Sequence, residues 1–260
     1  MFSLDECSRE DFYKKLKEYK MRKWMVLDEE MKIDLSNSIF LKDEQLLEEA
    51  VSRTIRETWE RSDKTGSQHF IRHLTQPHNT INRLTGTTGT GDFAPYMKEN
   101  LYYYPETELS LFVLLDENMT NIEHIMEGLG NIGRFGFGRD ASIGLGRFEI
   151  CDSDEIEIMD SKDANACYSL APCVPEKDMF ERIYFSPFIR FGKHGDRLAN
   201  AGNPFKNPVI MADEASVFIP KTRNVFEKPY IGSAVTGVSN VEPQSVVQGY
   251  TPYIPFRLEH

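Results

Sequence analysis

The chain has 260 residues, of which 40% are hydrophobic and 12% aromatic, enough to bury one sizeable core or two small ones. Its formal net charge of -11 argues against nonspecific coating of nucleic acid, because that affinity scales with the number of phosphates neutralised. No apolar run is long enough to cross a membrane and no basic-then-apolar leader is present, which predicts a globular cytoplasmic protein.

The cysteine pattern predicts neither a zinc site nor a disulfide framework. Cys7, Cys151, Cys167 and Cys173 lack C-x-x-C spacing and neighbouring pairs of histidines. We therefore expect reduced, mostly buried thiols, no metal and no cofactor.

The amino-terminal region predicts a helix, a strand and a longer helix. Residues 9–20 place Phe12, Leu16 and Tyr19 on one helical face, and a short apolar run at residues 23–27 predicts a buried strand. Small sheet domains of the split βαβ type need a strand before such a helix, so we expect that an amino-terminal piece is missing or supplied by another chain. Residues 43–61 predict one amphipathic helix.

Residues 75–96 predict a projecting hairpin. Threonine and isoleucine favour extended backbone, and the run G-T-T-G-T-G supplies a flexible tip. An ordinary surface hairpin is the alternative interpretation.

Next come a buried strand at residues 108–116, a short helix at residues 121–129 and a glycine-rich segment at residues 128–148. Seven of the 17 glycines lie in this segment, and glycine lets a ligand approach the main chain. Arg134, Arg139 and Arg147 indicate an anionic ligand. Strands are expected at residues 145–150 and 155–159.

Gly128-x-Gly130-x-x-Gly133 matches the dinucleotide-binding fingerprint. That fingerprint works where the loop follows a strand and opens a helix, whose amino terminus holds the pyrophosphate. Here a helix precedes the loop and a strand follows it, which excludes a Rossmann site. A Walker loop is absent as well.

Beyond residue 159 the composition predicts a second α+β lobe with several short strands and long loops. Residues 182–191, 209–220 and 250–258 are the strand candidates, and the prolines of the last one predict an edge position. The terminal residues 258–260 look like the start of a purification tag.

The two special segments carry the chemistry of an RNA-binding site. Arginine offers bidentate contacts to phosphates, and glycine amides face phosphate oxygens. Asparagine and threonine side chains bond sugars or base edges, here Asn79, Asn82, Thr85, Thr87 and Thr88. Phe93, Phe135 and Phe137 are candidates for stacking on unpaired bases, whereas Phe148 is expected to pack in the core.

Several motifs resemble RAMP-superfamily CRISPR proteins. G-F-G-R-D-A-S-I-G-L-G-R-F at residues 136–148 is similar to the glycine-rich loop of that superfamily. Together with residues 78–96 it resembles the subunit-4 family of type III-A Csm effector complexes. R-F-G-K-H-G, N-P-F-K-N-P-V-I-M, A-S-V-F and the terminal G-Y-T-P-Y-I-P-F also fit, so the resemblance covers most of the chain from about residue 10.

The resemblance implies an α+β fold with two ferredoxin-like, RRM-type lobes. The first, at residues 1–150, carries a helical insertion, a thumb hairpin at about residues 75–100 and the glycine-rich loop at residues 128–148, and the second occupies residues 151–257. The implied role is non-catalytic. The protein would hold the 5′ handle of the CRISPR RNA, dock the large polymerase-like subunit, join the backbone RAMP subunit and place its thumb near target RNA.

The resemblance also implies two sets of RNA-binding residues. The thumb set is His78, Asn79, Asn82, Arg83, Thr85, Gly86, Thr87 and Thr88, to which Phe93 is added as a stacking residue. The loop set is Gly133, Arg134, Gly136, Gly138, Arg139, Ser142, Gly144, Gly146 and Arg147.

The chain departs from the family in two places. Family members begin with a strand before the point where this chain starts, so the first lobe is expected to lack its amino-terminal part. Ala215 stands where the family tends to have glycine, so a tight turn at this position is in doubt. Two alternative functions remain, a RAMP endoribonuclease that processes precursor RNA with His78 or His194 as general base, and a purely structural assembly subunit.

Overall fold

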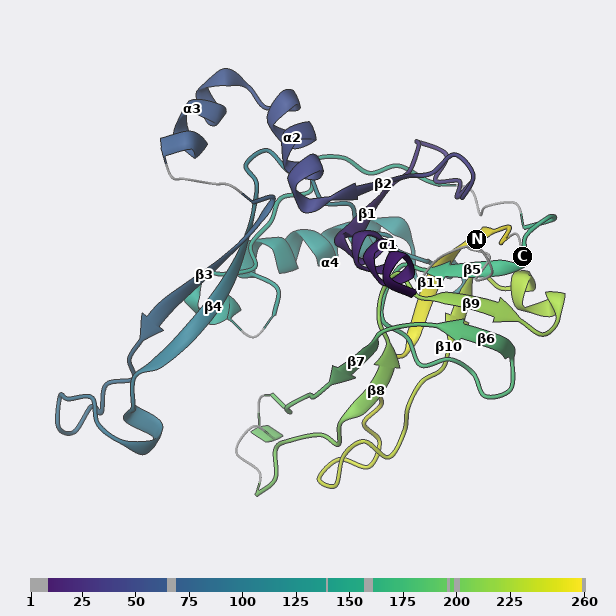
Figure 1. Cartoon of the computed structure of the whole chain (residues 1–260). Helices are drawn as coiled ribbons and strands as arrows, with labels where there is room; N and C mark the ends of the chain where they lie inside the picture. The colour runs from purple at the N-terminus through teal and green to yellow at the C-terminus, as the bar shows by residue number, and fades with distance from the viewer. Residues whose placement is uncertain are drawn as a thin grey trace. The chain divides into compact units, whose positions relative to one another are not determined.

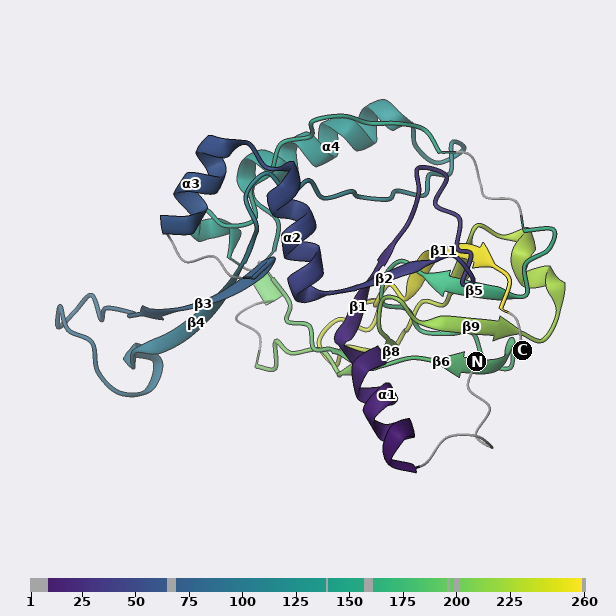
Figure 2. The ribbon, with the colours of Figure 1, turned by 45° about the horizontal axis from the view of Figure 1, so that its top comes forward.

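The protein is described by a computed structural model, which covers residues 9–64, 69–138, 140–156, 161–195, 197–198 and 202–258. Helices and antiparallel sheets are both present, so the fold is of the α+β class (Figures 1 and 2). Two compact units are found, unit 1 formed by Met1–Glu30 and Leu35–Ser110, and unit 2 by Met31–Asp34 and Leu111–His260. The glycine-rich segment is grouped with unit 2, whereas the sequence placed it in the first lobe. The lobe boundary at residue 150 stays a prediction.

Unit 1 begins with α1 (Arg9–Met21), which runs directly into β1 (Arg22–Val26). β1 pairs antiparallel with β2 (Ile39–Lys42), so the helix and the strand expected here are present, but β1 is exposed to half-buried and not buried as expected. The indole of Trp24 donates a hydrogen bond to Asp43 at 2.7 Å. That hydrogen bond lowers the pKa of the Asp43 carboxyl and ties β1 to the start of the next helix.

The single helix expected at residues 43–61 is wrong, because two helices occupy this range. α2 (Asp43–Arg53) and α3 (Arg56–Lys64) are separated at Thr54, whose backbone is extended at φ -79 and ψ 142. The Glu106 carboxylate accepts hydrogen bonds from the Ile55 N–H, at 3.2 Å, and from the Thr58 hydroxyl. A carboxylate at a helix amino terminus satisfies free N–H groups and complements the helix dipole, so it stabilises a new start there.

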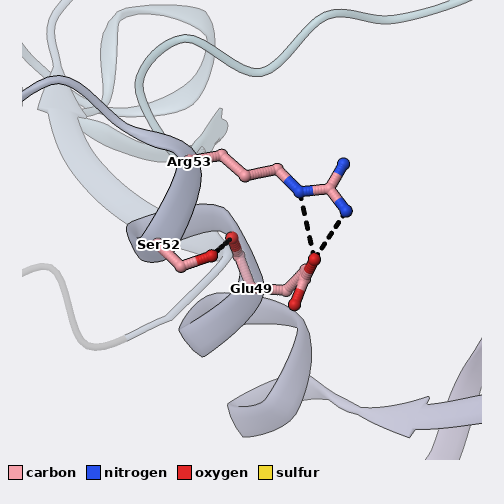
Figure 3. A network of polar contacts seen from close by, with 3 residues as sticks. All are labelled: Glu49, Ser52 and Arg53. Carbon is pink, nitrogen blue, oxygen red and sulfur yellow. Dashed lines mark hydrogen bonds and ion pairs between the residues drawn. The ribbon is translucent and has the colours of Figure 1, made fainter.

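The last turn of α2 carries a local polar network (Figure 3). Arg53 donates to one Glu49 carboxylate oxygen through Nε at 3.0 Å and Nη2 at 2.5 Å. The Ser52 hydroxyl donates to the Glu49 carbonyl at 2.8 Å. The ion pair joins residues four apart on an exposed face, where such pairs contribute only about 0.3–0.5 kcal/mol.

Two strands expected around the glycine-rich segment are wrong. Residues 108–116 and 145–150 form no strand, and the candidate at residues 155–159 falls largely outside the described residues. Leu111 and Val113 are exposed at 68% and 47%. Apolar and β-branched residues favour extended backbone, but a strand also needs a neighbour to receive its hydrogen bonds, and here the extended chain has none in the described ranges.

The helix expected at residues 121–129 is confirmed, but it continues to Phe135 as α4 (Ile122–Phe135). Its amino terminus is capped by Asn121, whose side-chain oxygen accepts the His124 N–H at 2.9 Å. Ile125, Met126 and Leu129 are half-buried as expected, whereas Ile122 is exposed. This apolar face outweighs the poor helix propensity of the glycines.

Unit 2 is built on a five-stranded antiparallel sheet in the order β10-β11-β5-β9-β6. Its strands are β5 (Ala166–Ser169), β6 (Phe180–Tyr184), β9 (Val217–Pro220), β10 (Tyr230–Gly232) and β11 (Tyr250–Phe256). The main core cluster consists of Cys167, Cys173, Phe180, Ala212, Phe218, Val225, Ile231 and Tyr253. Phe218 is fully buried, and its ring centroid lies 5.1 Å from that of Phe180.

The edge position expected for β11 is wrong, because β11 lies between β10 and β5. Pro252 lies opposite Tyr230 at the end of the short strand β10. The Pro252 carbonyl accepts a hydrogen bond from the Leu170 N–H at 3.1 Å, on the β5 side. The Phe256 carbonyl also accepts a hydrogen bond on that side. Pro255 therefore turns its nitrogen away from β5, at a point that β10 does not reach. An interior strand therefore tolerates proline at Pro255, where no ladder hydrogen bond is lost.

β7 (Pro187–Arg190) and β8 (Val209–Ala212) pair as a separate antiparallel ribbon. One face of the ribbon contributes to a second core cluster of Val209, Met211, Val238 and Val247, with Phe188 packed against it. The helical segments among the described residues after residue 150 are short 3-10 segments such as η4 (Arg223–Glu227), so the α-helices expected for a second α+β lobe are not found there.

The doubtful turn at Ala215 is formed, and alanine adopts the backbone that glycine favours. Its φ is 61°, in the left-handed region. The turn is held by the Ala215 N–H, which donates to the Ser169 carbonyl at 2.9 Å, and by the Ser216 N–H, which donates to the Ser169 hydroxyl at 3.0 Å. These contacts compensate for a conformation that costs an L-residue about 1–2 kcal/mol.

Replacing Ala215 by glycine is expected to raise the free energy of unfolding by about 0.5–1 kcal/mol, because released strain exceeds the added entropy of the unfolded chain. Urea denaturation checks this. Ala166→Gly in β5, where the backbone is an ordinary strand, is the control and should destabilise. A loss of stability with Ala215→Gly would contradict the inference that the Ala215 backbone is strained.

The two buried thiols fit the expected reduced, inert cysteines. Burial raises the pKa of Cys167 and of Cys173 to about 12. Cys151 is exposed, and Cys7 lies outside the described residues.

Within the described ranges, no helix combines the length and the apolar character that crossing a membrane requires.

Candidate nucleic-acid interface

The expected hairpin is confirmed in unit 1. β3 (Ile71–His78) and β4 (Tyr96–Tyr103) pair antiparallel in continuous register, from Ile71 opposite Tyr103 to His78 opposite Tyr96. Figure 1 shows a long two-stranded ribbon whose turn lies at the end away from α2 and α3. Residues 79–95 form this turn region and carry most of the thumb residues expected to bind RNA.

The tip is a small ordered turn. The Asn82 N–H donates to the Thr87 carbonyl at 3.0 Å, and Gly86, with φ 68°, donates back to the Asn82 carbonyl at 2.8 Å. The side-chain oxygen of Asn82 accepts the Leu84 N–H at 2.9 Å, and the hydroxyls of Thr85 and Thr87 lie 3.0 Å apart. Asn82 therefore holds the turn with its oxygen and leaves its amide NH₂ group for a ligand.

The base of the tip carries an aromatic stack that the sequence did not single out. The rings of His78 and Tyr96 lie 5.6 Å apart with an interplanar angle of 19°. The His78 Nε2 atom is shielded from solvent and has no hydrogen-bond partner among the described residues. Phe93 is half-buried in η1 (Gly91–Phe93), while Asn79, Arg83 and Thr88 are exposed.

The glycine-rich segment of unit 2 folds back on the end of α4. The Gly136 N–H donates to the Ile132 carbonyl at 2.7 Å and closes the helix. The chain then turns through η2 (Ala141–Ile143) and returns. The Phe137 N–H donates to the Gly146 carbonyl at 2.8 Å, and the Phe148 N–H to the Gly133 carbonyl at 3.3 Å.

Three glycines of this segment are required by contacts within the segment itself. A Cβ at Gly133 would lie 2.4 Å from the Phe148 carbonyl oxygen, and one at Gly136 would lie 2.3 Å from the Leu145 carbonyl oxygen. A Cβ at Gly146 would lie 2.1 Å from the Phe137 carbonyl oxygen. No side chain fits at these distances, so the packing of the loop itself requires glycine at these three positions.

Gly138 and Gly144 are different. Their φ values are 96° and 88°, and a Cβ at either would meet nothing within 4 Å. They shape an open loop to which a ligand has access. Gly128 and Gly130 lie inside α4, where space is also open. A dinucleotide fingerprint places its glycines in the turn before a helix, so this placement confirms that the fingerprint match is incidental.

Cationic and aromatic side chains surround the fold-back. Arg134 and Arg147 are exposed, and neither forms an ion pair or hydrogen bond with another described residue. Phe135 and Phe137 are exposed at 76% and 75%, as stacking candidates must be. The core position expected for Phe148 is wrong, since its ring covers Gly133 and is 39% exposed.

The thumb set and the loop set of expected RNA-binding residues lie in different units. The thumb residues gather at one end of the β3–β4 hairpin in unit 1, and the loop residues gather at the end of α4 in unit 2. Arg139 lies outside the described residues, and the Ser142 side chain does too. The sequence did not single out Tyr96, because only the strand register places its ring opposite that of His78.

No group of three His, Cys, Asp or Glu side chains arranged to hold a metal ion is found in the part of the chain that the structure describes. Neither a protein-family model nor a curated protein matches this chain.

Proposed function

We propose that the protein is a non-catalytic RNA-binding subunit of a type III-A CRISPR interference complex. It holds the 5′ handle of the CRISPR RNA and bridges the large polymerase-like subunit to the backbone subunits. The observation that carries the proposal is the fold-back at residues 133–148. It presents two arginines that pair with no other described residue, two exposed phenylalanines and an open glycine loop within one short segment.

This arrangement suits the backbone and the bases of a single strand. An arginine that has no internal ion pair keeps its full hydrogen-bonding fork for a phosphate. Exposed aromatic rings next to such cations stack on unpaired bases, the usual way in which single-stranded RNA is bound. Because the whole chain is acidic, with a net charge of -11, RNA binding depends on local clusters of this kind.

The hairpin supports the proposal from unit 1. Its tip offers the amide of Asn82, the guanidinium of Arg83 and two threonine hydroxyls on a turn that is already ordered. An ordered turn loses little conformational entropy on binding. In the proposal this hairpin is the thumb, which contacts the guide strand and lies near target RNA.

The proposal includes two ferredoxin-like lobes.

Alanine at both Arg134 and Arg147 is expected to weaken binding of handle RNA about 100-fold, because each charged hydrogen bond contributes about 1.4 kcal/mol. The salt dependence should flatten by about one unit of slope for each phosphate contact removed. The measurement compares RNA that carries the repeat-derived handle with RNA whose handle is scrambled, using the complex assembled with its partner subunits.

The matched control is Arg56→Ala with Arg182→Ala, which removes the same charge from exposed arginines that form ion pairs elsewhere. It should leave the affinity within about threefold. Equal affinity for the scrambled handle, or an unchanged affinity in the Arg134 and Arg147 variant, would refute the proposal.

The same samples test for cleavage. His194, one of the two histidines considered as a general base, is buried, and its Nε2 lies 2.7 Å from the Ser239 hydroxyl. That hydroxyl also accepts the N–H groups of Val241 and Glu242, so its own proton is directed to His194. These contacts fit a histidine that anchors a loop. Metal-free cleavage of repeat RNA that is lost on substituting His78 or His194 would favour the endoribonuclease instead.

A further inference from the structure

The β7–β8 ribbon continues beyond the end of its two strands, at residues 191–194 and 204–206. After Arg190 opposite Val209, the pairing continues as a bridge between Lys193 and Phe205. The Lys206 N–H donates to the Gly192 carbonyl at 2.8 Å, and the His194 N–H donates to the Pro204 carbonyl at 2.8 Å. These bonds hold the two backbone segments of the tip side by side.

Two aromatic rings are stacked on this tip and remain open to solvent. The centroids of Phe191 and Phe205 lie 5.6 Å apart with an interplanar angle of 20°. Phe191 is 62% exposed and Phe205 is 47% exposed. Each ring covers part of the other, so most of the remaining ring surface faces water. Exposed, parallel aromatic rings form a flat apolar surface of the kind on which a base stacks.

Positive charge also gathers at the tip of this acidic chain. Residues 190–207 contain four cationic residues, Arg190, Lys193, Arg197 and Lys206, against the single acidic residue Asp196. The Lys193 ammonium lies 5.6 Å from the centroid of the Phe205 ring. Apolar rings next to several cations match a base and its phosphate, because the rings stack and the cations neutralise charge.

The tip is anchored from below, which keeps the rings in place. His194 is buried, and its Nε2 is hydrogen bonded to Ser239. Asn207 donates its backbone N–H to the Val238 carbonyl at 2.8 Å and its side-chain amide to the Gly237 carbonyl at 3.2 Å. These bonds connect the tip to the loop that contributes Val238 to the second core cluster. A preorganised platform loses little entropy when a base stacks on it.

We propose that this tip, defined by Phe191, Lys193, Phe205 and Lys206, binds a short stretch of single-stranded nucleic acid by base stacking. The excess of positive charge favours a nucleic acid over a protein segment on an otherwise acidic molecule. The site uses neither the thumb nor the glycine-rich fold-back, so it stands independently of handle recognition. Its binding is indifferent to base sequence, because every base has a face that stacks.

The test measures binding of fluorescent oligouridine and oligothymidine of about a dozen nucleotides, a length within the roughly 4–16 nucleotides that small single-strand sites cover. Fluorescence anisotropy of the full chain at low salt gives the affinities. Phe191→Ala is expected to weaken binding about 5- to 150-fold, the range that one stacked base contributes. Phe191→Trp should retain or strengthen binding. The oligouridine and oligothymidine arms decide whether RNA, DNA or both are bound.

Phe185→Ala is the matched control, since Phe185 is 52% exposed on the same unit. It should leave binding within about twofold, because a lone exposed ring outside the basic tip offers no comparable site. Lys193→Ala should weaken binding less than Phe191→Ala does and flatten the salt dependence by about one unit. Unchanged thermal denaturation of each variant shows that the fold is intact.

Three outcomes would overturn the proposal: no binding of either oligonucleotide by the unmodified chain, unchanged binding by Phe191→Ala, or an equal loss with Phe185→Ala. The handle-binding proposal is tested by other variants, so either proposal can fail while the other holds. Alanine at Arg134 and Arg147 should remove the preference for handle RNA and leave oligouridine binding at the tip, whereas Phe191→Ala should do the reverse.

Discussion

Replacing Phe218 by alanine is expected to lower the free energy of unfolding of unit 2 by about 3–5 kcal/mol. Phe218 is fully buried in β9, lies opposite Cys167 in the strand register and packs against Phe180 at 5.1 Å. Removing this ring loses its burial and leaves a cavity that strands on both sides cannot close. The loss is large against the few kcal/mol that stabilise a typical domain.

The loss of stability can be assigned to unit 2, because each unit contains its own probe. The buried thiols of Cys167 and Cys173 report on the core around Phe218, so their reaction with a maleimide as urea rises measures the opening of unit 2. Both tryptophans, Trp24 and Trp59, lie in unit 1, and their fluorescence serves as the internal control.

Phe185→Ala, which truncates an exposed phenylalanine, should cost less than about 0.5 kcal/mol. If Phe218→Ala cost no more than this control, the core of unit 2 would lie elsewhere.

Replacing Gly133 by alanine is expected to open the glycine-rich fold-back, with a loss of about 1–3 kcal/mol of stability and most of the affinity for handle RNA. The added Cβ would lie 2.4 Å from the Phe148 carbonyl oxygen, which is main chain and has little room to move. The Phe148 N–H bond to the Gly133 carbonyl, at 3.3 Å, would be lost with it. Arg147, next to Phe148, would then leave its place beside the end of α4.

Gly130→Ala is the matched control in the same helix. A Cβ there meets nothing within 4 Å, and alanine is the better helix former by about 1 kcal/mol. This variant should be as stable as the unmodified protein or more so, with unchanged affinity for handle RNA. Urea denaturation and RNA titration on both variants check the contrast. Identical behaviour of the two alanines would mean that the fold-back does not form.

The elements that the sequence predicted correctly are those with a local signal. The spacing of apolar residues indicated α1 and α4, and the glycine-rich tip between β-favouring residues indicated the β3–β4 hairpin. The sequence also shows the glycine-rich segment, but it does not show that its glycines have different structural roles. Gly133, Gly136 and Gly146 allow main chain to approach main chain, and only the contacts across the fold-back distinguish them from Gly138 and Gly144.

The elements that it predicted wrongly depend on distant residues. Glu106 separates α2 from α3 by capping α3, although it is far from both in the sequence. Residues 108–116 have the composition of a strand but no neighbour that completes a ladder in the described ranges. β11 lies inside its sheet despite two prolines, because β10 is too short to reach Pro255.

By itself, the sequence determined the α+β class, the hairpin, the position of the glycine-rich segment and the arginine and phenylalanine residues on which the proposed RNA contacts rest. These follow from periodicity and composition, which act over a few residues. The tertiary structure alone decided which glycines are structural, which phenylalanines are exposed and that Phe191 stacks on Phe205 beside Lys193. The reason is physical: stacking and close backbone approach join residues brought together only when the chain turns back on itself.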